Sequence, residues 1–375
     1  MKVLFLIPDG YLPAARRNFI YLVVKLAQEC SKLEVETVVA GLREVTYFGR
    51  HVLHNSLGIH RLNDLLNSFV DARPLGFVTP RIDDVLYSEI LAKLGIDAVF
   101  IPQLGHAPIG LYRASARAGV PLLVWDSEGH PSLFESKWKE FYGQPNVILL
   151  TMNLGIIPFI KEQTKNTKVF HFPYFCDPET FYPLRNRVEE YDISYTGNYK
   201  QYGVPRLGQV DGGPTTKETG FKMTVDPLAQ VYKERLHLFG AGYPRQGPLA
   251  KCSTEGVISW EQTNIVNNRS RVCLSIHSDD YRSSSLALNP RFFSILSSQG
   301  FMLTDHVKDV ETWFETGKDF VVTESAKETL ELVDYYMHSP LERETVSRNG
   351  RRAVLRSHTA HHRAQLLREL MMKYC

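Results

Sequence analysis

The feature that most constrains the fold is an alternation of short apolar runs with helical patterns along most of the chain. In the first half, apolar runs with the length of buried strands occur at residues 3–7, 36–39, 98–101, 122–125 and 147–150. Helical patterns lie between most of them, including a stripe of Phe19, Leu22, Val23 and Leu26 and stretches at residues 87–94 and 109–118. This alternation predicts a parallel sheet with helices on both faces, where ligands bind at the carboxyl ends of the strands.

A proline-rich break interrupts the pattern, and a second alternating region follows it. The break covers residues 172–183, and the next strand starts at Tyr191 and ends in a turn at Gly197-Asn198. Further strands are predicted at residues 236–239, 272–276, 301–303 and 320–322. A chain of 375 residues is too long for one ordinary core, so this second region indicates a second domain.

The predicted fold class is α/β, with two doubly wound Rossmann-like domains facing a central cleft. We place an N-terminal domain at residues 1–172, a linker at 173–190, a C-terminal domain at 191–360 and a final helix at 361–375 that returns to the N-terminal domain. Capping-box patterns begin two late helices, at Ser325 with Glu328 and at Ser339 with Glu342, the latter with Pro340 at its first position. Residues 204–220, rich in Gly, Pro and Thr, are predicted to form a loop.

Charge, cysteine content and hydropathy exclude several classes of protein. The 43 basic and 41 acidic residues give a net charge of +2, unlike a strongly basic nucleic-acid binder. The five cysteines are scattered without CxxC spacing, which indicates neither a disulfide framework nor a zinc site and fits a reducing compartment. The opening apolar run is too short for a signal peptide, and no run approaches a membrane span. We therefore expect a cytoplasmic protein, with a peripheral membrane contact left open.

One predicted helix start is suited to holding an anion. Asn289 is a preferred N-cap, Pro290 is favoured at the first helical position, and Arg291 follows where free backbone N–H groups point outward. Gly300 is expected to close this helix before an apolar strand. Because the helix dipole and the forked guanidinium act on the same charge, we predict a phosphate or diphosphate of a nucleotide-type ligand here. The alternative is an ordinary capped helix with a surface arginine.

The C-terminal half, residues 191–375, contains a series of short motifs whose order and spacing together are more specific than any single motif. They are Asp192-Ile193-Ser194-Tyr195-Thr196-Gly197-Asn198, Asn289-Pro290-Arg291-Phe292-Phe293, Gly300-Phe301-Met302-Leu303-Thr304-Asp305, Trp313-Phe314, Gly317-Lys318, Tyr335-Tyr336, residues 340–343, Gly350-Arg351-Arg352, His358-Thr359 and His362-Arg363. In this order they resemble the glycosyltransferase domain of the spore-maturation CgeB-like proteins, a branch of the GT-B glycosyltransferases. The N-terminal half matches that family only in general character.

The resemblance implies a GT-B hexosyl- or pentosyltransferase that takes its sugar from a nucleotide-diphosphate donor, expected to be UDP-linked. The C-terminal domain would hold the donor and the N-terminal domain a hydroxyl acceptor, such as a glycan, a peptide or a small molecule. GT-B relatives need no metal for the diphosphate, so no metal or other cofactor is expected. The family pattern usually has Glu where this chain has Ser294, and many retaining relatives have another Glu where it has Leu286. The ribose contact and retaining stereochemistry are therefore not carried over.

Within this family reading, positive groups should stabilise the charge that develops on the leaving diphosphate. Arg291 is the main candidate, and the expected donor site also contains Asn289, Pro290, Phe292, Ser294, His277, Arg282, Gly197, Asn198 and Lys200. His277 and Arg282 flank the loop that leaves the strand at 272–276, and Lys200 and Arg206 follow the turn at 197–198. The structural alternatives are a strand cap for His277, a solvated charge for Arg282, and mobile surface residues for Lys200 and Arg206.

The general base for the acceptor hydroxyl is expected at strand ends of the N-terminal domain. Asp126, Glu128 and His130 follow the predicted strand at 122–125 and form the densest group of proton acceptors in that half. Asp9 and His106, which also follow predicted strands, compete with them. The structural alternative for each is a turn residue or a helix cap. Asp279-Asp280 could suggest a metal, but two adjacent loop aspartates are usually solvated.

Three rival functions stay open. The C-terminal stretch contains Arg343, Arg348, Arg351, Arg352, Arg356, Arg363 and Arg368, mixed with Glu342, Glu344 and Glu369. Its simplest interpretation is a solvated helix face, but a nucleic-acid acceptor, such as a modified DNA base in a phage, is a second possibility. Another rival is a catalytically inactive sugar-nucleotide-binding protein, because Glu is absent at position 294. The last is a nucleotide-sugar epimerase on the same fold.

Overall fold

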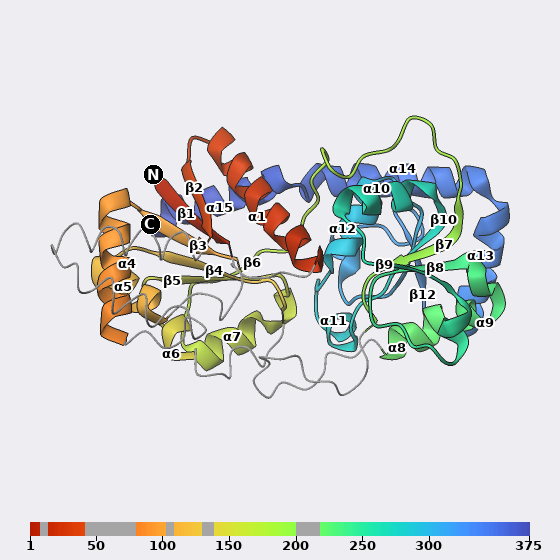
Figure 1. Ribbon diagram of the computed structural model, residues 1–375, viewed down its shortest axis with the longest axis horizontal. Coiled ribbons are helices and arrows are strands. Elements are labelled where there is room, and N and C mark those ends of the chain that lie inside the picture. Colours follow the sequence, from red (N-terminus) through yellow and green to blue (C-terminus); the bar gives the residue numbers. More distant parts are fainter. Residues whose placement is uncertain (8–13, 42–79, 103–108, 130–138, 200–217) are drawn as a thin grey trace, which may run out of the picture.

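The computed structural model describes residues 1–7, 14–41, 80–102, 109–129, 139–199 and 218–375, which form two α/β units side by side (Figure 1). The first unit is a parallel sheet in the order β2-β1-β3-β4-β5-β6. Its strands are β1 (Lys2–Ile7), β2 (Glu36–Gly41), β3 (Ala98–Ile101), β4 (Leu122–Asp126), β5 (Val147–Thr151) and β6 (Val169–His171). Its helices are α1 (Ala14–Lys32), α4 (Pro80–Leu94), α5 (Ile109–Ala118), α6 (Lys139–Tyr142) and α7 (Ile157–Thr164). The five predicted strands are confirmed.

The second unit is also a parallel sheet, in the order β12-β11-β10-β7-β8-β9. Its strands are β7 (Tyr191–Thr196), β8 (Leu236–Phe239), β9 (Ser253–Gly256), β10 (Ser270–Ser275), β11 (Met302–Asp305) and β12 (Val321–Thr323). Its helices are α8 (Glu218–Gly220), α9 (Asp226–Tyr232), α10 (Trp260–Arg269), α11 (Asp279–Ser283), α12 (Pro290–Ser297), α13 (Ala326–His338) and α14 (Pro340–Ser357). The last helix of the chain is α15 (Ala360–Tyr374). Part of the predicted loop at 204–220, residues 218–220, is helical; residues 200–217 lie outside the described residues.

The central strands are apolar on both faces because helices cover both sides of each sheet. Every residue of β3, β4 and β5 is buried. On one face of β4, Val124 joins a cluster with Leu4 and Val99. On the other face, Trp125 joins Phe100 in a second cluster. This two-sided burial is typical of parallel sheets and explains why these strands read as continuous apolar runs.

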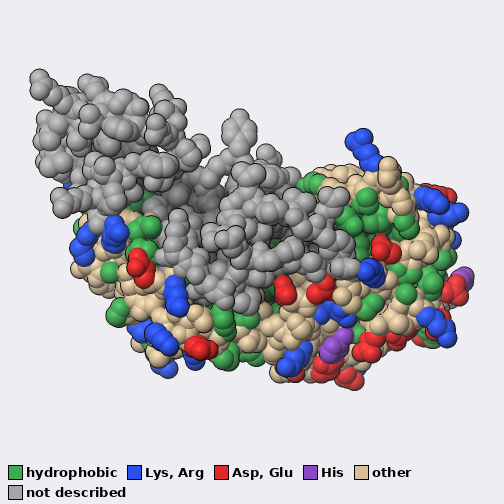
Figure 2. Space-filling model, turned by 90° about the horizontal axis from the view of Figure 1, so that it is seen from below, with side chains coloured by type: hydrophobic (Ala, Val, Ile, Leu, Met, Phe, Trp, Pro, Cys, Tyr) green, Lys and Arg blue, Asp and Glu red, His purple; other side chains and the backbone are tan. Residues whose placement is uncertain are grey.

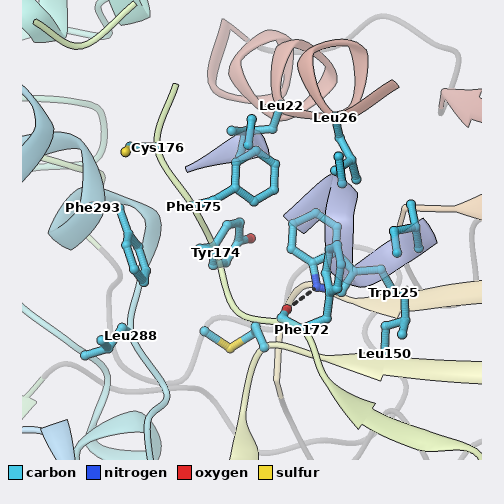
Figure 3. Packing of buried hydrophobic residues seen from close by; sticks show 14 of the residues in the cluster. Leu22, Leu26, Trp125, Leu150, Phe172, Tyr174, Phe175, Cys176, Leu288 and Phe293 are labelled. Carbon is cyan, nitrogen blue, oxygen red and sulfur yellow. Dashed lines mark hydrogen bonds between the residues drawn. The ribbon is translucent and has the colours of Figure 1, made fainter. Parts of the chain in front are cut away.

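The segment between the two sheets is packed on both units. Phe172, Tyr174 and Phe175 lie against Trp125 of the first unit, and the Trp125 indole donates to the Phe172 carbonyl at 3.0 Å (Figure 3). Cys176 lies on the side of this segment that faces Phe293 of α12. One apolar cluster therefore continues from the first unit into the second.

Helix α14 lies on the second unit, and α15 returns to pack beside α1 (Figure 1). Arg363 of α15 is buried, and its guanidinium donates to the carbonyls of Pro173 at 2.9 Å and Tyr174 at 3.2 Å. This contact fastens the final helix to the segment between the sheets. Among the described helices, none has an apolar stretch that could cross a bilayer.

Helix α12 begins at the predicted residue, but the left-handed residue that ends it comes one position before Gly300. Gln299, and not Gly300, has the left-handed backbone, with φ of 58°. The Gly300 N–H donates to the Ile295 carbonyl at 3.0 Å, as at the end of a Schellman motif. Gly300 is required for another reason, since an added Cβ would lie only 3.0 Å from the Asn267 carbonyl oxygen.

Candidate active site

The carboxyl edge of the second sheet has a point where the strand order reverses. From β7 the chain continues to β8 and β9 on one side, whereas β10, β11 and β12 lie on the other. The connections that leave β7 and β10 therefore go in opposite directions. In open α/β sheets this switch point is the usual ligand site.

Arg291 lies across this switch point. Asn289 caps α12 by accepting from the Phe292 N–H at 3.1 Å, and Pro290 occupies the first turn, as predicted. The half-buried Arg291 guanidinium donates to the carbonyl of Thr196, at the end of β7, and to that of Ile276, after β10, at 3.2 Å. A cation and a helix N-terminus thus meet at the ends of the two central strands.

The turn after β7 is shaped around this guanidinium. An added Cβ on Gly197 would lie 2.2 Å from Arg291 Nη2, so a larger residue there would force the guanidinium to move from this position. The guanidinium also stacks over the Tyr195 ring, 4.5 Å from its centroid. Asn198 accepts from the Ala241 N–H at 2.9 Å, which joins the loops after β7 and β8.

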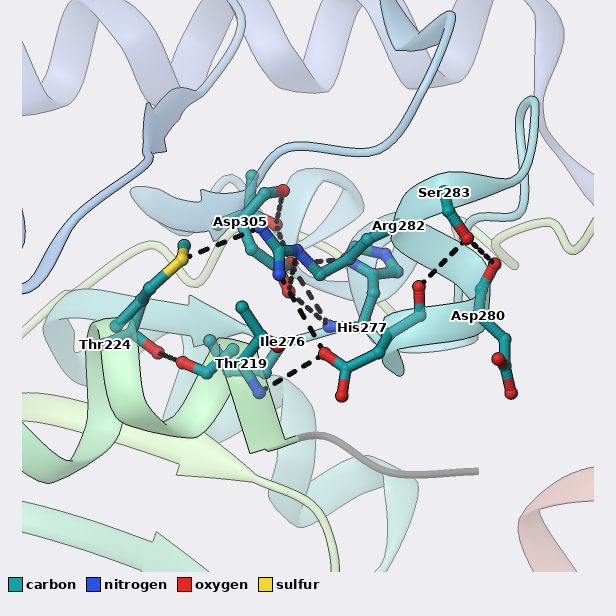
Figure 4. A network of polar contacts seen from close by, with 12 residues as sticks. Thr219, Thr224, Ile276, His277, Asp280, Arg282, Ser283 and Asp305 are labelled. Carbon is teal, nitrogen blue, oxygen red and sulfur yellow. Dashed lines mark hydrogen bonds and ion pairs between the residues drawn. The ribbon is translucent and has the colours of Figure 1, made fainter. Parts of the chain in front are cut away.

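A buried polar network follows β10 (Figure 4). The His277 Nδ1 lies 2.7 Å from Asp305 Oδ1, and the His277 backbone N–H faces both Asp305 carboxylate oxygens at 3.1 Å. Arg282 Nε lies 3.5 Å from Asp305 Oδ2. The carboxylate at the end of β11 is therefore placed between an imidazole and a guanidinium, both of which follow β10.

Several polar atoms at this edge have no hydrogen-bond partner in the described part of the chain. They are Ser275 Oγ, His277 Nε2, Ser278 Oγ and Arg282 Nε. An unsatisfied buried polar group costs about 1–3 kcal/mol. Their concentration after one strand is expected where a polar ligand supplies the missing partners.

Helix α8 approaches this network closely. An added Cβ on Gly220 would lie 2.5 Å from Ile276 and 2.9 Å from Asp305 Oδ2. The Thr219 N–H faces Asp279 Oδ1 at 3.3 Å, and the same oxygen lies 3.9 Å from Arg282. Sequence reasoning missed Gly220 and Asp305 as site residues, although Asp305 ends a motif of the family resemblance. A carboxylate at the end of a central strand was the available signal.

Asp126 ends β4 in the first unit and is buried. Its Oδ1 accepts from the Glu128 and Gly129 N–H groups at 3.2 and 2.8 Å, and its Oδ2 accepts from the Thr151 hydroxyl at 2.8 Å. Burial raises the pKa of the Asp126 carboxyl to about 7, although these hydrogen bonds act in the opposite direction. Both carboxylate oxygens of Asp126 therefore accept hydrogen bonds within the first unit, as expected for a turn residue.

The loops after β4 and β5 contact the second unit next to the polar network. The Tyr281 hydroxyl of α11 donates to the Glu128 carbonyl. The Ser284 hydroxyl lies 2.5 Å from Asn153 Oδ1, and the Gly155 N–H donates to the Ser285 carbonyl at 3.2 Å. The half-buried Glu128 is therefore on the side of the first unit that faces α11.

Of the other residues considered for the site, some are buried in the second unit and some lie outside the described residues. Phe292 is buried in the core, with its ring 6.2 Å from that of His277. Ser294 is buried and donates to the Arg291 carbonyl at 3.0 Å, and Leu286 is buried with a left-handed φ of 53°. Asp9, His106, His130, Lys200 and Arg206 lie outside the described residues.

Comparisons with known proteins bear on this site. Residues 217–369 match the family model described as Glycosyl transferase-like. The chain is similar to the crystal structure of a glycosyltransferase from Rickettsia africae, with a TM-score of 0.64, 12% identity, and coverage of 100% of this chain and 98% of that one. It is similar to Anabaena HepE in complex with UDP-glucose, with a TM-score of 0.61, 10% identity and coverage of 100% of both chains. None of the curated protein sequences compared with the chain matches it.

A DNA-modifying β-glucosyltransferase has a similar likeness, with a TM-score of 0.58, 10% identity, and coverage of 99% of this chain and 100% of that one. At these identities each likeness shows the fold alone. The chain therefore has the GT-B fold, with two Rossmann-like units, and the match to the glycosyl transferase-like family lies in its second unit, at residues 217–369.

Proposed function

We propose that this glycosyltransferase moves a sugar from a UDP-linked donor, held by residues 191–360, to a hydroxyl acceptor held by residues 1–172. The observation that carries the proposal is the position of Arg291 at the switch point, on the first turn of α12. In the described ranges no carboxylate forms an ion pair with this guanidinium, which leaves its charge for an anion. UDP-glucose in the Anabaena HepE complex supports the choice of nucleotide.

In the proposed reaction the acceptor oxygen attacks the anomeric carbon as the bond to the diphosphate breaks. Arg291 and the α12 N-terminus stabilise the negative charge that develops on the leaving group. No metal enters these steps, because the cation and the helix dipole supply the positive charge.

Glu128 is the first candidate for the general base that takes the acceptor proton. It belongs to the loop after β4 that contacts α11, whereas both carboxylate oxygens of its neighbour Asp126 are bound within the loop and to Thr151. Asp126, at the end of β4, is the next candidate, and the sequence adds His130 and Asp9, which lie outside the described residues.

We further assign the chain to the CgeB-like branch. The family model supports a glycosyltransferase domain without specifying the branch. The ordered motifs between residues 192 and 363 support the finer assignment.

Among the alternatives, a DNA acceptor has the weakest support. On the face seen in Figure 2, basic and acidic side chains are intermixed over the described surface of both units, without a continuous basic field. The likeness to the DNA-modifying enzyme concerns the fold alone. A steep fall of DNA affinity with increasing salt concentration would favour this acceptor. An inactive binder would bind UDP-glucose without hydrolysing it or transferring the sugar. An epimerase would convert the sugar of UDP-glucose into its epimer.

The proposal is tested by calorimetric titration of UDP into the protein and into Arg291→Ala. We expect the dissociation constant to rise by about 30-fold, equivalent to roughly 2 kcal/mol for a lost charge-assisted contact. Arg352→Ala removes an exposed arginine of α14 and serves as the matched control. Equal UDP affinities of the wild type and Arg291→Ala would remove Arg291 from the donor site.

Donor hydrolysis tests the base separately. Glu128→Gln should leave UDP affinity unchanged and lower turnover by about 100-fold or more, as for a lost general base. If turnover stays within about tenfold, the base is another residue of the same edge.

A further inference from the structure

The Asp305 carboxylate determines where the His277 imidazole carries its proton. Both side chains are fully buried, and Asp305 Oδ1 lies 2.7 Å from His277 Nδ1. An ionised carboxylate only accepts hydrogen bonds, so Nδ1 must be the protonated nitrogen. The backbone N–H of His277, 3.1 Å from both carboxylate oxygens, holds the two groups in this orientation.

His277 and Arg282 lie beside the same buried carboxylate. Arg282, with Nε 3.5 Å from Asp305 Oδ2, already places one positive charge beside this carboxylate. A second cation at His277 would be fully buried and would share the Asp305 carboxylate with Arg282, whose other carboxylate contact, Asp279, lies 3.9 Å away. With the proton on Nδ1, His277 Nε2 therefore presents a lone pair.

This lone pair has no partner in the described part of the chain. It belongs to the residue that follows Ile276, whose carbonyl accepts from both Arg291 and Asn289. His277 is thus the next residue in the chain after Ile276, whose carbonyl holds Arg291, the residue proposed to bind the diphosphate. A lone pair repels phosphate oxygens and suits a group that donates a hydrogen bond.

A nucleotide-sugar donor offers hydroxyl groups, and the positions where related enzymes use Glu have no carboxylate to accept from them here. The Ser294 hydroxyl donates inside its helix, and Leu286 is apolar and buried. His277 Nε2 is an acceptor at the same edge of the sheet.

We infer that Asp305 is a positioning residue that fixes the proton of His277 on Nδ1, so that Nε2 accepts a hydrogen bond from a hydroxyl group of the nucleotide-sugar donor. The inference rests on the proposed function, since it requires such a donor at this edge. The hydroxyl belongs either to the ribose or to the transferred sugar.

Calorimetric titrations with UDP, 2′-deoxy-UDP, 3′-deoxy-UDP and UDP-glucose distinguish these sources. If the ribose is bound, the wild type prefers UDP over one deoxy analogue by about tenfold, and this preference disappears in His277→Leu and Asp305→Asn. If the sugar is bound, these variants lose about tenfold in the affinity for UDP-glucose relative to that for UDP. Glu255→Gln is the matched control, because Glu255 pairs with His237 at 3.3 Å on β8 and β9 of the same sheet.

The tautomer is measured by ¹⁵N NMR of histidine-labelled protein, with His277→Leu used to assign the signal. We expect Nδ1–H and an unprotonated Nε2 in the free wild type, and a shift of the proton to Nε2 in Asp305→Asn, whose amide can donate to Nδ1. A merely structural role of Asp305 would lower the melting temperature without changing this signature.

The outcomes separate the inference from the proposed function. If the wild type binds neither UDP nor UDP-glucose, the proposed donor is wrong and the inference falls with it. If the wild type binds them and both hydroxyl preferences persist in His277→Leu, only the inference is overturned. A proton on Nε2 of the free wild type also overturns it, even if Asp305→Asn fails to fold.

Discussion

Asp126 should make the folded protein less stable as the pH rises towards 8. Its carboxyl is 1% exposed, and burial raises its pKa from 3.8 to about 7. Between these two values the folded state binds a proton that the unfolded state has released, so the free energy of unfolding falls with increasing pH. The interval spans about three pH units at about 1.4 kcal/mol each, so the penalty approaches roughly 4 kcal/mol above pH 7.

Asp126→Asn removes this penalty while keeping the shape of the side chain. The amide oxygen can accept from the Glu128 and Gly129 N–H groups, and the amide nitrogen can donate to the Thr151 hydroxyl oxygen. We expect the variant to be more stable than the wild type at pH 8, with a difference that shrinks through pH 7 and vanishes near pH 4.

Urea denaturation followed by circular dichroism at several pH values between 4 and 8.5 measures this difference. Asp334→Asn, at a carboxyl that is 75% exposed on α13, is the control and should leave the free energy of unfolding nearly unchanged. A difference between Asp126→Asn and the wild type that does not depend on pH, or a variant less stable at pH 8, refutes the reasoning.

Two further substitutions test contacts that hold the site and the fold. Gly197→Ala should displace the Arg291 guanidinium and weaken UDP binding by about tenfold or more in calorimetry, and normal affinity would contradict this account of the close contact. Arg363→Met should lower the free energy of unfolding by roughly 2–4 kcal/mol in urea, because the Pro173 and Tyr174 carbonyls lose a buried donor. Arg363→Lys should recover only part of this loss, since a single ammonium cannot reproduce the planar fork.

The strands that the sequence predicted best are those buried on both faces. The pattern at residues 98–101 matches β3, because every side chain there contacts a helix-covered core. The short edge strands β6 (Val169–His171) and β9 (Ser253–Gly256) were missed. Strand β6 is only three residues long, and β9 consists of polar, mostly exposed residues without an apolar run.

Helix starts were predictable only where the cap depends on neighbouring residues alone. Ser325 caps α13 as its pattern predicted, with the side chain accepting from the Glu328 N–H at 3.2 Å. The capping box at Ser339 is wrong, since Ser339 makes no side-chain cap, although α14 does begin at Pro340. Glu342 instead accepts from the Tyr335 hydroxyl at 2.6 Å, a contact with the preceding helix that the local pattern does not contain.

The predicted strand ends of the second unit indicated which residues could bind the donor. Which of these residues contact each other depends on the order of the strands in the sheet. Arg291 contacts the carbonyls of both Thr196 and Ile276 because β10 lies beside β7, although β7 is far away in the sequence. The pairing of His277 with Asp305 likewise requires β11 to lie beside β10. The sequence named Arg291 and His277 as candidates and contained Asp305 in a motif, without indicating which of these residues touch.

The segment after β10 connects the two halves of the proposed reaction. Residue 277 belongs to the polar network of the second unit, while Tyr281 and Ser284, a few residues later, contact the Glu128 carbonyl and Asn153 of the first unit. Backbone geometry limits how far these contacts can separate, since each residue spans at most about 3.6 Å. The Tyr281 contact with the Glu128 carbonyl therefore places the proposed acceptor base within a few residues of the proposed donor network along one chain segment. In the proposed reaction this short connection favours alignment of the two groups.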